Sequence, residues 1–268
     1  MSKEISAERR KYLKKKLMTK VFVRLVQVAI VLILVALWEV LANAGVIDSF
    51  IMSKPSQIVD TFVDMVSDDL LFHIWITCEE TIIGFLLGTV LGVAIASILW
   101  WFPFLSSVSA PFLVVLNSLP KVALGPIIIV WVGAGTPAII TMALAISLVV
   151  TILEMLNGFN STDRNKIKMA ETFGANRLQV FCKIVFPSNV PVLLNAMKVN
   201  IGLSMVGVIT GEFLVSKGGL GYLIVYGGQV FKLNLVMTSV IILGLVATLM
   251  YQGVILLEKL INSKGKWN

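Results

Sequence analysis

Long apolar stretches alternate with short polar segments along most of the chain. The first runs from Leu25 to Leu41 and is interrupted only by Gln27 and Glu39. Each stretch is close to the ~20 residues that a helix needs to cross the hydrocarbon core of a bilayer. The pattern predicts an all-α membrane protein with six transmembrane helices. The other five stretches cover residues 81–101, 108–132, 137–156, 190–215 and 235–257.

The third stretch differs from the others because prolines interrupt it, with Lys121 near its middle, directly after Pro120. A proline inside a helix removes a hydrogen-bond donor and frees a carbonyl. A charge at the centre of a span costs at least ~2.5–3.5 kcal/mol. The sequence therefore predicts a broken span around a lysine.

An amphipathic segment follows the first span. After Pro55, apolar residues recur with helical period and aspartates lie between them. We expect a short helix lying on the membrane surface. Its apolar positions are Ile58, Val59, Phe62, Met65 and Val66.

A polar segment, residues 157–187, separates the fourth and fifth spans. Asp163 can cap a helix, Gly174 can end it, and Pro187 can begin another. The spacing of the apolar residues predicts two short helices that present a small apolar face. The pattern alone fits either a loop on lipid headgroups or a docking element for a soluble partner. The apolar residues are Ile167, Ala170, Phe173, Leu178, Phe181 and Cys182.

Composition agrees with a membrane protein, since 57% of the residues are apolar and only 14% are charged. These values exclude a disordered chain and an ordinary soluble enzyme, and two cysteines are too few for a disulfide framework. Nucleic acid is an unexpected partner despite the net charge of +7, because the position of the charges matters more than their sum.

The basic residues indicate the orientation. Seventeen Lys and Arg residues fall in the N-terminal arm, the 157–183 segment and the C-terminal tail, against three in the segments on the opposite side. Because basic loops face the cytoplasm, we expect both termini to be cytoplasmic in a multi-pass protein of a bacterial cell membrane. Residues 1–24 then form a basic arm and residues 25–268 a transmembrane domain.

Catalytic motifs do not occur. The chain has no phosphate-binding Gly-x-x-x-x-Gly-Lys-Ser/Thr loop and no hydrolase elbow. His73, the single histidine, lies outside the predicted spans among acidic residues typical of an exposed loop. We therefore expect no enzyme activity, no metal site and no cofactor in this chain.

Polar residues inside the spans are candidate pathway residues. Lys121 is either a residue that attracts or gates an anion, or a buried lysine that caps a carbonyl or pairs with a glutamate. Lys198 is close enough to the cytoplasmic interface to reach it with its side chain. The remaining candidates are Asn117, Ser118 and Pro120 beside Lys121, and Asn200, Ser204 and Glu212 in the fifth span.

The 157–187 segment resembles the cytoplasmic signature of the binding-protein-dependent ABC importer permeases. That signature reads Glu-Ala-Ala, three residues, Gly, nine residues, Ile, one residue, Leu-Pro. Gly174, Ile184 and Pro187 match it in register, whereas Phe186 replaces the leucine and Lys168 stands where the glutamate is usual.

Further motifs are similar to those of the nitrate, taurine and aliphatic-sulfonate branch. They are the block from Asn117 to Gly135 and the block from Gly211 to Leu223. At the start of the second span, however, Glu80 stands where that branch often has arginine.

The resemblance implies a type I ABC importer permease. It implies a second permease copy, most simply as a homodimer, two cytoplasmic ABC ATPases that hold ATP and Mg²⁺, and an extracytoplasmic solute-binding protein. It also implies that residues 163–182 are a coupling helix seated in a groove of the ATPase. The expected coupling residues are Asp163, Ile167, Lys168, Ala170, Glu171, Phe173, Gly174 and Ala175.

The sequence predicts the transported solute less sharply than it predicts the family. Lys121 favours a small anion such as a sulfonate, taurine or nitrate, but the branch also includes permeases for vitamin precursors and other heterocycles. An ion-coupled secondary transporter is a more distant alternative that would require paired carboxylates at mid-membrane. A membrane anchor for a cytoplasmic enzyme would leave the broken third span unexplained.

Overall fold

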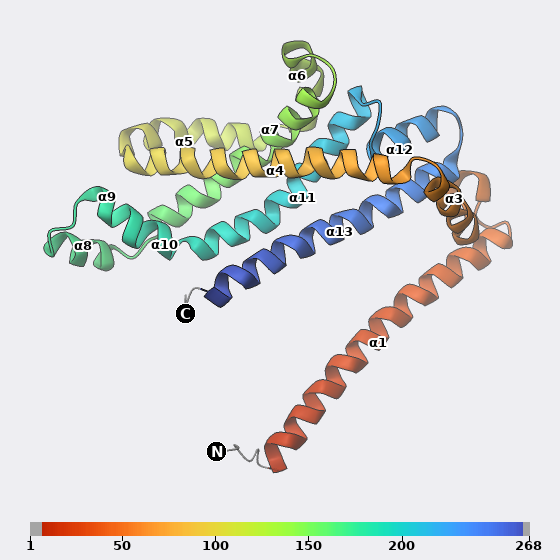
Figure 1. The fold of residues 1–268 in the computed structure, drawn as a ribbon, viewed down its shortest axis with the longest axis horizontal. Helices are drawn as coiled ribbons and strands as arrows, with labels where there is room; N and C mark the ends of the chain where they lie inside the picture. The colour runs from red at the N-terminus through yellow and green to blue at the C-terminus, as the bar shows by residue number, and fades with distance from the viewer. Residues whose placement is uncertain (1–6, 265–268) are drawn as a thin grey trace.

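The computed structural model describes residues 7–264, which contain helices and no strand. Figure 1 shows long helices packed side by side, as expected from the apolar pattern. The elements are α1 (Ala7–Asn43), α2 (Ser49–Met52), α3 (Pro55–Ser67), α4 (Leu70–Trp101), α5 (Pro103–Ser118), a 3₁₀ turn η1 (Lys121–Leu124), α6 (Gly125–Val132), α7 (Thr136–Asn160), α8 (Arg164–Thr172), α9 (Arg177–Val180), a π-turn η2 (Phe181–Val185), α10 (Phe186–Ser188), α11 (Val190–Val215), α12 (Leu220–Gln229) and α13 (Leu233–Lys264).

Five of these helices are long and apolar enough to span a bilayer, and the bent α5–α6 pair is the sixth candidate. The predicted fifth span coincides with α11. The prediction for the second span was wrong at its start, because α4 begins at Leu70 and not near Thr81. Its first turns contain three polar residues that interrupt the apolar run: His73 accepts a hydrogen bond, Glu80 is buried and Glu79 is exposed.

Helices α4, α7 and α11 form the centre of the bundle and approach one another closely. Ala143 of α7 lies between two glycines, and a Cβ atom on Gly84 of α4 would stand 2.6 Å from its Cβ. A Cβ on Gly207 of α11 would stand 2.5 Å from the Ala143 Cα. Small residues allow helices in lipid to gain contact by close approach.

The predicted break of the third span is present. Helix α5 tolerates Pro111 and ends at Ser118, and the chain turns by 90° between α5 and the η1–α6 segment. Pro120 directly precedes η1, where its ring prevents α5 from continuing.

The helix ends gather into two groups (Figure 1). The corner between α4 and α5 lies with α8, α9 and α10, whereas α3 and α12 lie at the opposite end. Residues 102–107 and 157–183, which the charge pattern places on one side of the membrane, therefore share one end of the bundle.

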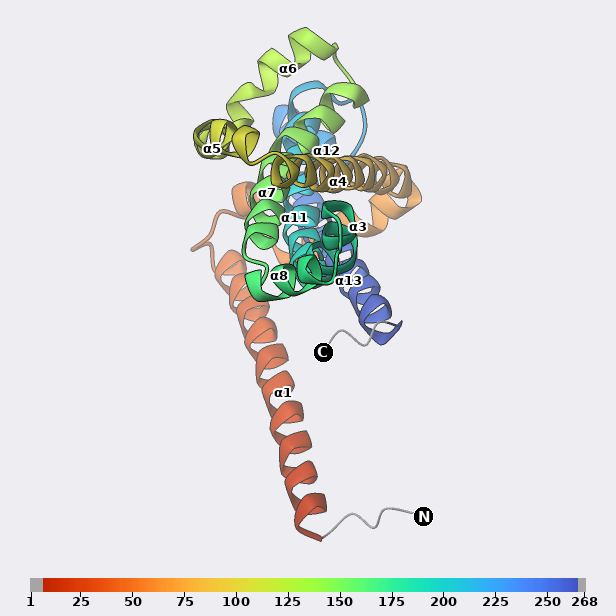
Figure 2. The same cartoon turned by 90° about the vertical axis from the view of Figure 1, so that its left-hand side faces the viewer.

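Helix α1 extends away from the bundle (Figure 2). It is tied to α3 through Glu39, whose carboxylate accepts hydrogen bonds from the Ser56 N–H at 3.1 Å and the Ser56 hydroxyl at 3.0 Å. The amphipathic helix predicted after Pro55 is α3. Ile58 and Met65 are buried, whereas Val59 is 60% exposed.

Candidate functional site

The predicted coupling segment has the expected helix–glycine–helix form. Helix α8 begins after Asp163, whose carboxylate accepts the Asn165 N–H at 2.8 Å. The chain then reverses at Gly174, which has φ +82°, a conformation that favours glycine. Asn176 and Gln179 form a capping box at the start of α9. The second helix is divided, because the π-turn η2 separates α9 from α10.

One face of this segment packs into the bundle. Ile167, Ala170 and Ala175 contact a buried cluster that includes Met155 and Val185. These contacts fix α8 against the ends of the spanning helices.

An aromatic group joins the same segment to the α4–α5 corner. The Phe181 ring lies 5.0 Å from the Trp100 ring and 5.5 Å from the Phe159 ring, measured between centroids. The Arg177 guanidinium stands 5.6 Å from the centre of the Trp100 ring and 5.4 Å from that of Trp101. The segment therefore contacts both α4 and α7.

The other face of the segment projects into solvent. Phe173 is 84% exposed, and Met169 and Leu178 are each 58% exposed. Lys168 and Glu171 are exposed beside them. The expectation of a single apolar face was therefore wrong: Ile167, Ala170 and Phe181 point inward and a separate set points outward. We call Met169, Phe173 and Leu178 the outward triad.

The candidate residues of the broken span lie together at the bend. The Lys121 ammonium donates to the Asn117 carbonyl at 3.0 Å, and the Ser118 hydroxyl donates to the Val114 carbonyl at 2.9 Å. Asn117, Ser118 and Pro120 are exposed. Lys121 thus caps a carbonyl in the last turn of α5, where the helix ends and supplies no further backbone donor.

The candidates in α11 lie elsewhere, inside the bundle. The Asn200 amide donates to the Thr151 hydroxyl, and the buried Ser204 hydroxyl has no hydrogen-bond partner within residues 7–264. Lys198 pairs with Glu258 of α13, with 2.8 Å between nitrogen and oxygen. The structure therefore separates the α11 candidates from those at the bend.

Glu212, 2% exposed, lies at the centre of a hydrogen-bond network around the start of α12. Its carboxylate accepts the Thr77 hydroxyl at 2.7 Å and the Gly221 N–H at 2.5 Å. The Thr77 oxygen in turn accepts the Leu220 N–H at 2.8 Å. Side chains of α4 and α11 thus satisfy backbone donors that the first turn of α12 cannot satisfy itself.

His73 takes part in the same network and is not an exposed loop residue, as the sequence suggested. Its Nδ1 accepts the Gly219 N–H at 3.0 Å, and its ring stacks on Tyr222 at 6.0 Å between centroids. Its partners follow about 146 positions later in the chain, so no local pattern indicated this role.

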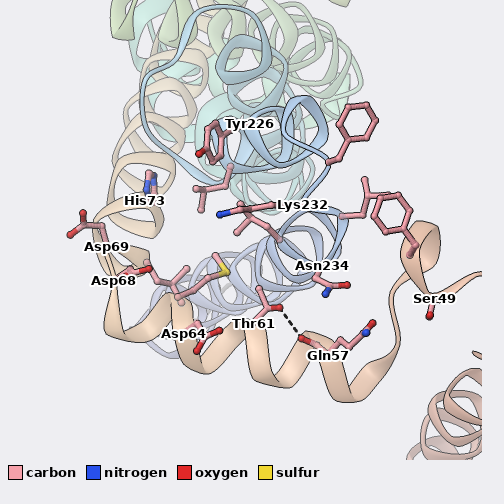
Figure 3. Close-up of a pocket in the computed structure, with 17 residues that line it drawn as sticks. Ser49, Gln57, Thr61, Asp64, Asp68, Asp69, His73, Tyr226, Lys232 and Asn234 are labelled. Carbon is pink, nitrogen blue, oxygen red and sulfur yellow. Dashed lines mark hydrogen bonds between the residues drawn. The ribbon is translucent and has the colours of Figure 1, made fainter. Parts of the chain in front are cut away.

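A cavity of about 990 Å³ adjoins this network at the α3–α12 end of the bundle (Figure 3). Asp64, Asp68, Asp69 and His73 line one side, and Lys232 reaches into the hollow from the α12–α13 connection. The described residues contain no group of three or more His, Cys, Asp or Glu side chains placed to hold a metal ion.

A second cavity, of about 560 Å³, lies between the start of α4, the turn before α7 and the end of α11. Glu80 lines it and is only 3% exposed. The predicted second span, residues 81–101, leaves Glu80 just outside it. The signal that could have identified it is a carboxylate inside the apolar run that begins at Leu70.

Comparison with known proteins identifies the family. Residues 84–264 match the family described as "Binding-protein-dependent transport system inner membrane component". This match covers more than half of the chain. The chain belongs to this family of ABC importer permeases.

Relatives within the family carry different solutes in their names. The putative aliphatic sulfonates transport permease SsuC of Bacillus subtilis is 26% identical over 85% of this chain and 83% of the relative. The formylaminopyrimidine transport permease ThiX of Halalkalibacterium halodurans is 28% identical over 71% of this chain and 76% of the relative. The riboflavin transport system permease RibX of Chloroflexus aurantiacus is 28% identical over 86% of each.

A solved structure shares the fold. The inward-facing MetNI methionine ABC transporter matches with a TM-score of 0.56 and 19% identity, covering 69% of this chain and 95% of that one. As an ABC permease, the chain is a multi-pass membrane transport subunit and not an enzyme. ATP is hydrolysed by a separate partner subunit.

Proposed function

We propose that this permease pairs with a second copy of itself and encloses the path of a small solute across a bacterial cell membrane. Two ATPase subunits with bound ATP and Mg²⁺ dock at the α8 end, and a solute-binding protein delivers the solute at the opposite end. Both termini are then cytoplasmic. The distribution of basic residues supports this orientation.

The proposal that the ATPase docks here rests on the exposure of the outward triad. Met169 and Phe173 lie one helical turn apart and both are exposed, so they form an apolar patch on a polar segment. Exposed apolar patches with polar rims mark protein–protein contact sites. Lys168 and Glu171 surround the triad with charge, which is typical of a docking surface with a polar rim. Asp163 and Gly174 fix the shape of this surface.

The inward contacts of the same segment support its role in coupling. Ile167, Ala170 and Ala175 pack against the bundle, and Arg177 and Phe181 join it to α4 and α7. When the two ATPases close on ATP, this segment moves with them and carries the spanning helices toward the outward-facing state. The energy for this change is the difference in binding between the two states.

Two classes of solute have specific support. A small anion such as a sulfonate, taurine or nitrate is supported by Lys121 and by the aliphatic sulfonates relative. A nitrogen heterocycle is supported by the formylaminopyrimidine relative. Of the candidate pathway residues, Asn200 and Ser204 have buried polar atoms that find no partner in the described part of the chain. A path that opens beside α11 makes these atoms available to a solute.

A co-purification experiment tests this proposal. The full chain is expressed with the ATPase and binding protein encoded beside its gene and is isolated through an affinity tag on the permease. We expect the ATPase to co-purify with the wild-type chain. Phe173→Asp should reduce its recovery at least about tenfold, because a charge would be buried in an apolar contact.

The matched control is Phe50→Asp, at a phenylalanine that is 61% exposed at the opposite end of the bundle. It should leave ATPase recovery unchanged. Failure to recover any ATPase with the wild-type chain would refute the proposal.

A further inference from the structure

The 560 Å³ cavity beside α4 has walls of mixed chemistry. Phe72 and Ile76 supply apolar surface, and Glu80, Thr136 and Ser216 supply polar groups. It lies at the end of the bundle opposite α8, where a solute would enter from a binding protein. Its volume is in the range of cavities that hold small organic molecules.

Glu80 is the unusual group in this wall. The side chain is 3% exposed, and its Oε2 atom has no hydrogen-bond partner among the described residues. A buried carboxyl group stays ionised only when it is paired with a cation or satisfied by donors, and otherwise takes up a proton. The Glu80 Oε2 atom is therefore free to accept a donor from a bound group.

Glu212 provides the internal comparison, since it lies within electrostatic range of Glu80 and is buried to a similar extent. Its two oxygens accept the Thr77 hydroxyl and the Gly221 N–H, so the fold satisfies this carboxylate itself. Two neighbouring carboxylates also disfavour each other's charge. The fold thus supplies hydrogen-bond donors to both oxygens of Glu212, whereas the Glu80 carboxyl faces the cavity with its Oε2 atom unpaired in the described chain.

The described part of the chain supplies no counter-ion to Glu80. The ion pair found within 4.0 Å there joins Lys198 to Glu258, and no lysine or arginine nitrogen comes that close to Glu80. Lys217 lines the same cavity but is exposed and stands beyond that distance. A cation that pairs with ionised Glu80 must therefore come from outside these residues.

We propose that this cavity binds the cationic nitrogen group of the transported solute, as an ammonium, an amidinium or a protonated aminoheterocycle. Glu80 accepts its N–H donors, and the Thr136 hydroxyl beside the same carboxyl orients it. Glu79 adds a second negative charge to the lining. The proposal rests on the importer function and narrows its solute to molecules that carry such a group, including aminosulfonates.

The test uses the full chain in lipid nanodiscs, with Cys78 and Cys182 replaced by serine and Ala134→Cys as a reporter in the cavity wall. Labelling of this reporter is measured at pH 8 with a trimethylammonium methanethiosulfonate and a sulfonate methanethiosulfonate. We expect Glu80→Gln to lower the ratio of cationic to anionic labelling rates about fivefold or more. Asp64→Asn, which removes a charge from the other cavity, is the control and should leave the ratio unchanged.

A second measurement on the same reporter tests ligand binding without altering Glu80. Millimolar benzamidine, an amidinium, should slow labelling by the neutral methyl methanethiosulfonate, and benzoate of the same shape should not. The proposal is wrong if the two compounds protect equally or not at all, or if Glu80→Gln leaves the rate ratio unchanged. The assay contains no ATPase, so its result is independent of the co-purification experiment.

Discussion

Thr77 of α4 donates a hydrogen bond of 2.7 Å to Glu212 of α11, and the two residues are 135 positions apart in the chain. Both side chains are buried, and both accept backbone N–H groups from the first turn of α12. Together these three hydrogen bonds join α4, α11 and α12 at the end of the bundle opposite α8. The bond with Thr77 shows Glu212 in a structural contact, and the place of Glu212 in the pathway stays a prediction.

A double-mutant cycle with Thr77→Val and Glu212→Gln measures this contact. Each single variant leaves a buried group without its partner, so each should lower the midpoint of thermal unfolding in detergent. We expect a coupling free energy of about 0.5–2 kcal/mol, the range for polar pairs between membrane helices. Strictly additive effects of the two substitutions would show that the bond does not join the helices.

Gly174 should be sensitive to alanine for conformational reasons alone. No atom lies within 4 Å of a Cβ placed there, but its φ of +82° is unfavourable for other residues. Gly174→Ala should therefore cost about 1 kcal/mol and reduce ATPase recovery by distorting the turn after α8. Gly202→Ala is the control, because it also has open space but lies within α11. That variant should be neutral or stabilising, and equal losses would contradict the explanation.

The position of Lys121 predicts a difference between two substitutions. Lys121→Ala leaves the Asn117 carbonyl without its side-chain donor, and we expect impaired transport with normal membrane insertion. Lys121→Gln keeps an N–H donor and removes the charge, so a capping role predicts retained function. The readout is ATP hydrolysis by the assembled importer stimulated by its loaded binding protein. Equal impairment by both substitutions would instead support a direct interaction of the charge with an anion.

The Lys198–Glu258 pair explains a charged residue inside α11. The two side chains are 23% and 25% exposed, so water partly screens them. Lys198→Met should lower the free energy of unfolding by about 0.5–1 kcal/mol. The reversed pair Lys198→Glu with Glu258→Lys should regain most of that loss in the same thermal unfolding assay. A reversed pair no more stable than Lys198→Met would show that the contact is not the cause.

Local signals were sufficient for much of this fold. The apolar stretches give the spanning helices, and Pro120 gives the break in the third. Asp163 and Gly174 define the coupling segment because a helix cap and a left-handed turn depend on neighbouring residues only. These elements are predictable from one sequence for that reason.

Other features depend on contacts between distant residues. The first turns of α4 contain His73 and Thr77, which form hydrogen bonds to Gly219 and Leu220 after α11. A hydropathy pattern does not include such contacts, so it places the end of the apolar stretch at the polar residues there. The division of the 157–187 segment into inward and outward faces depends on Trp100 and Phe159. The exposure of the outward triad therefore appears only in the folded chain.

The most direct test of the central claim is ATP hydrolysis by the complete importer in nanodiscs, measured with the wild-type permease and with Phe173→Ala. The account predicts that truncation of Phe173 uncouples the complex, so that the loaded binding protein no longer stimulates hydrolysis while the permease keeps its thermal stability. Unchanged stimulation in the Phe173→Ala complex would contradict the assignment of residues 163–182 as the coupling element.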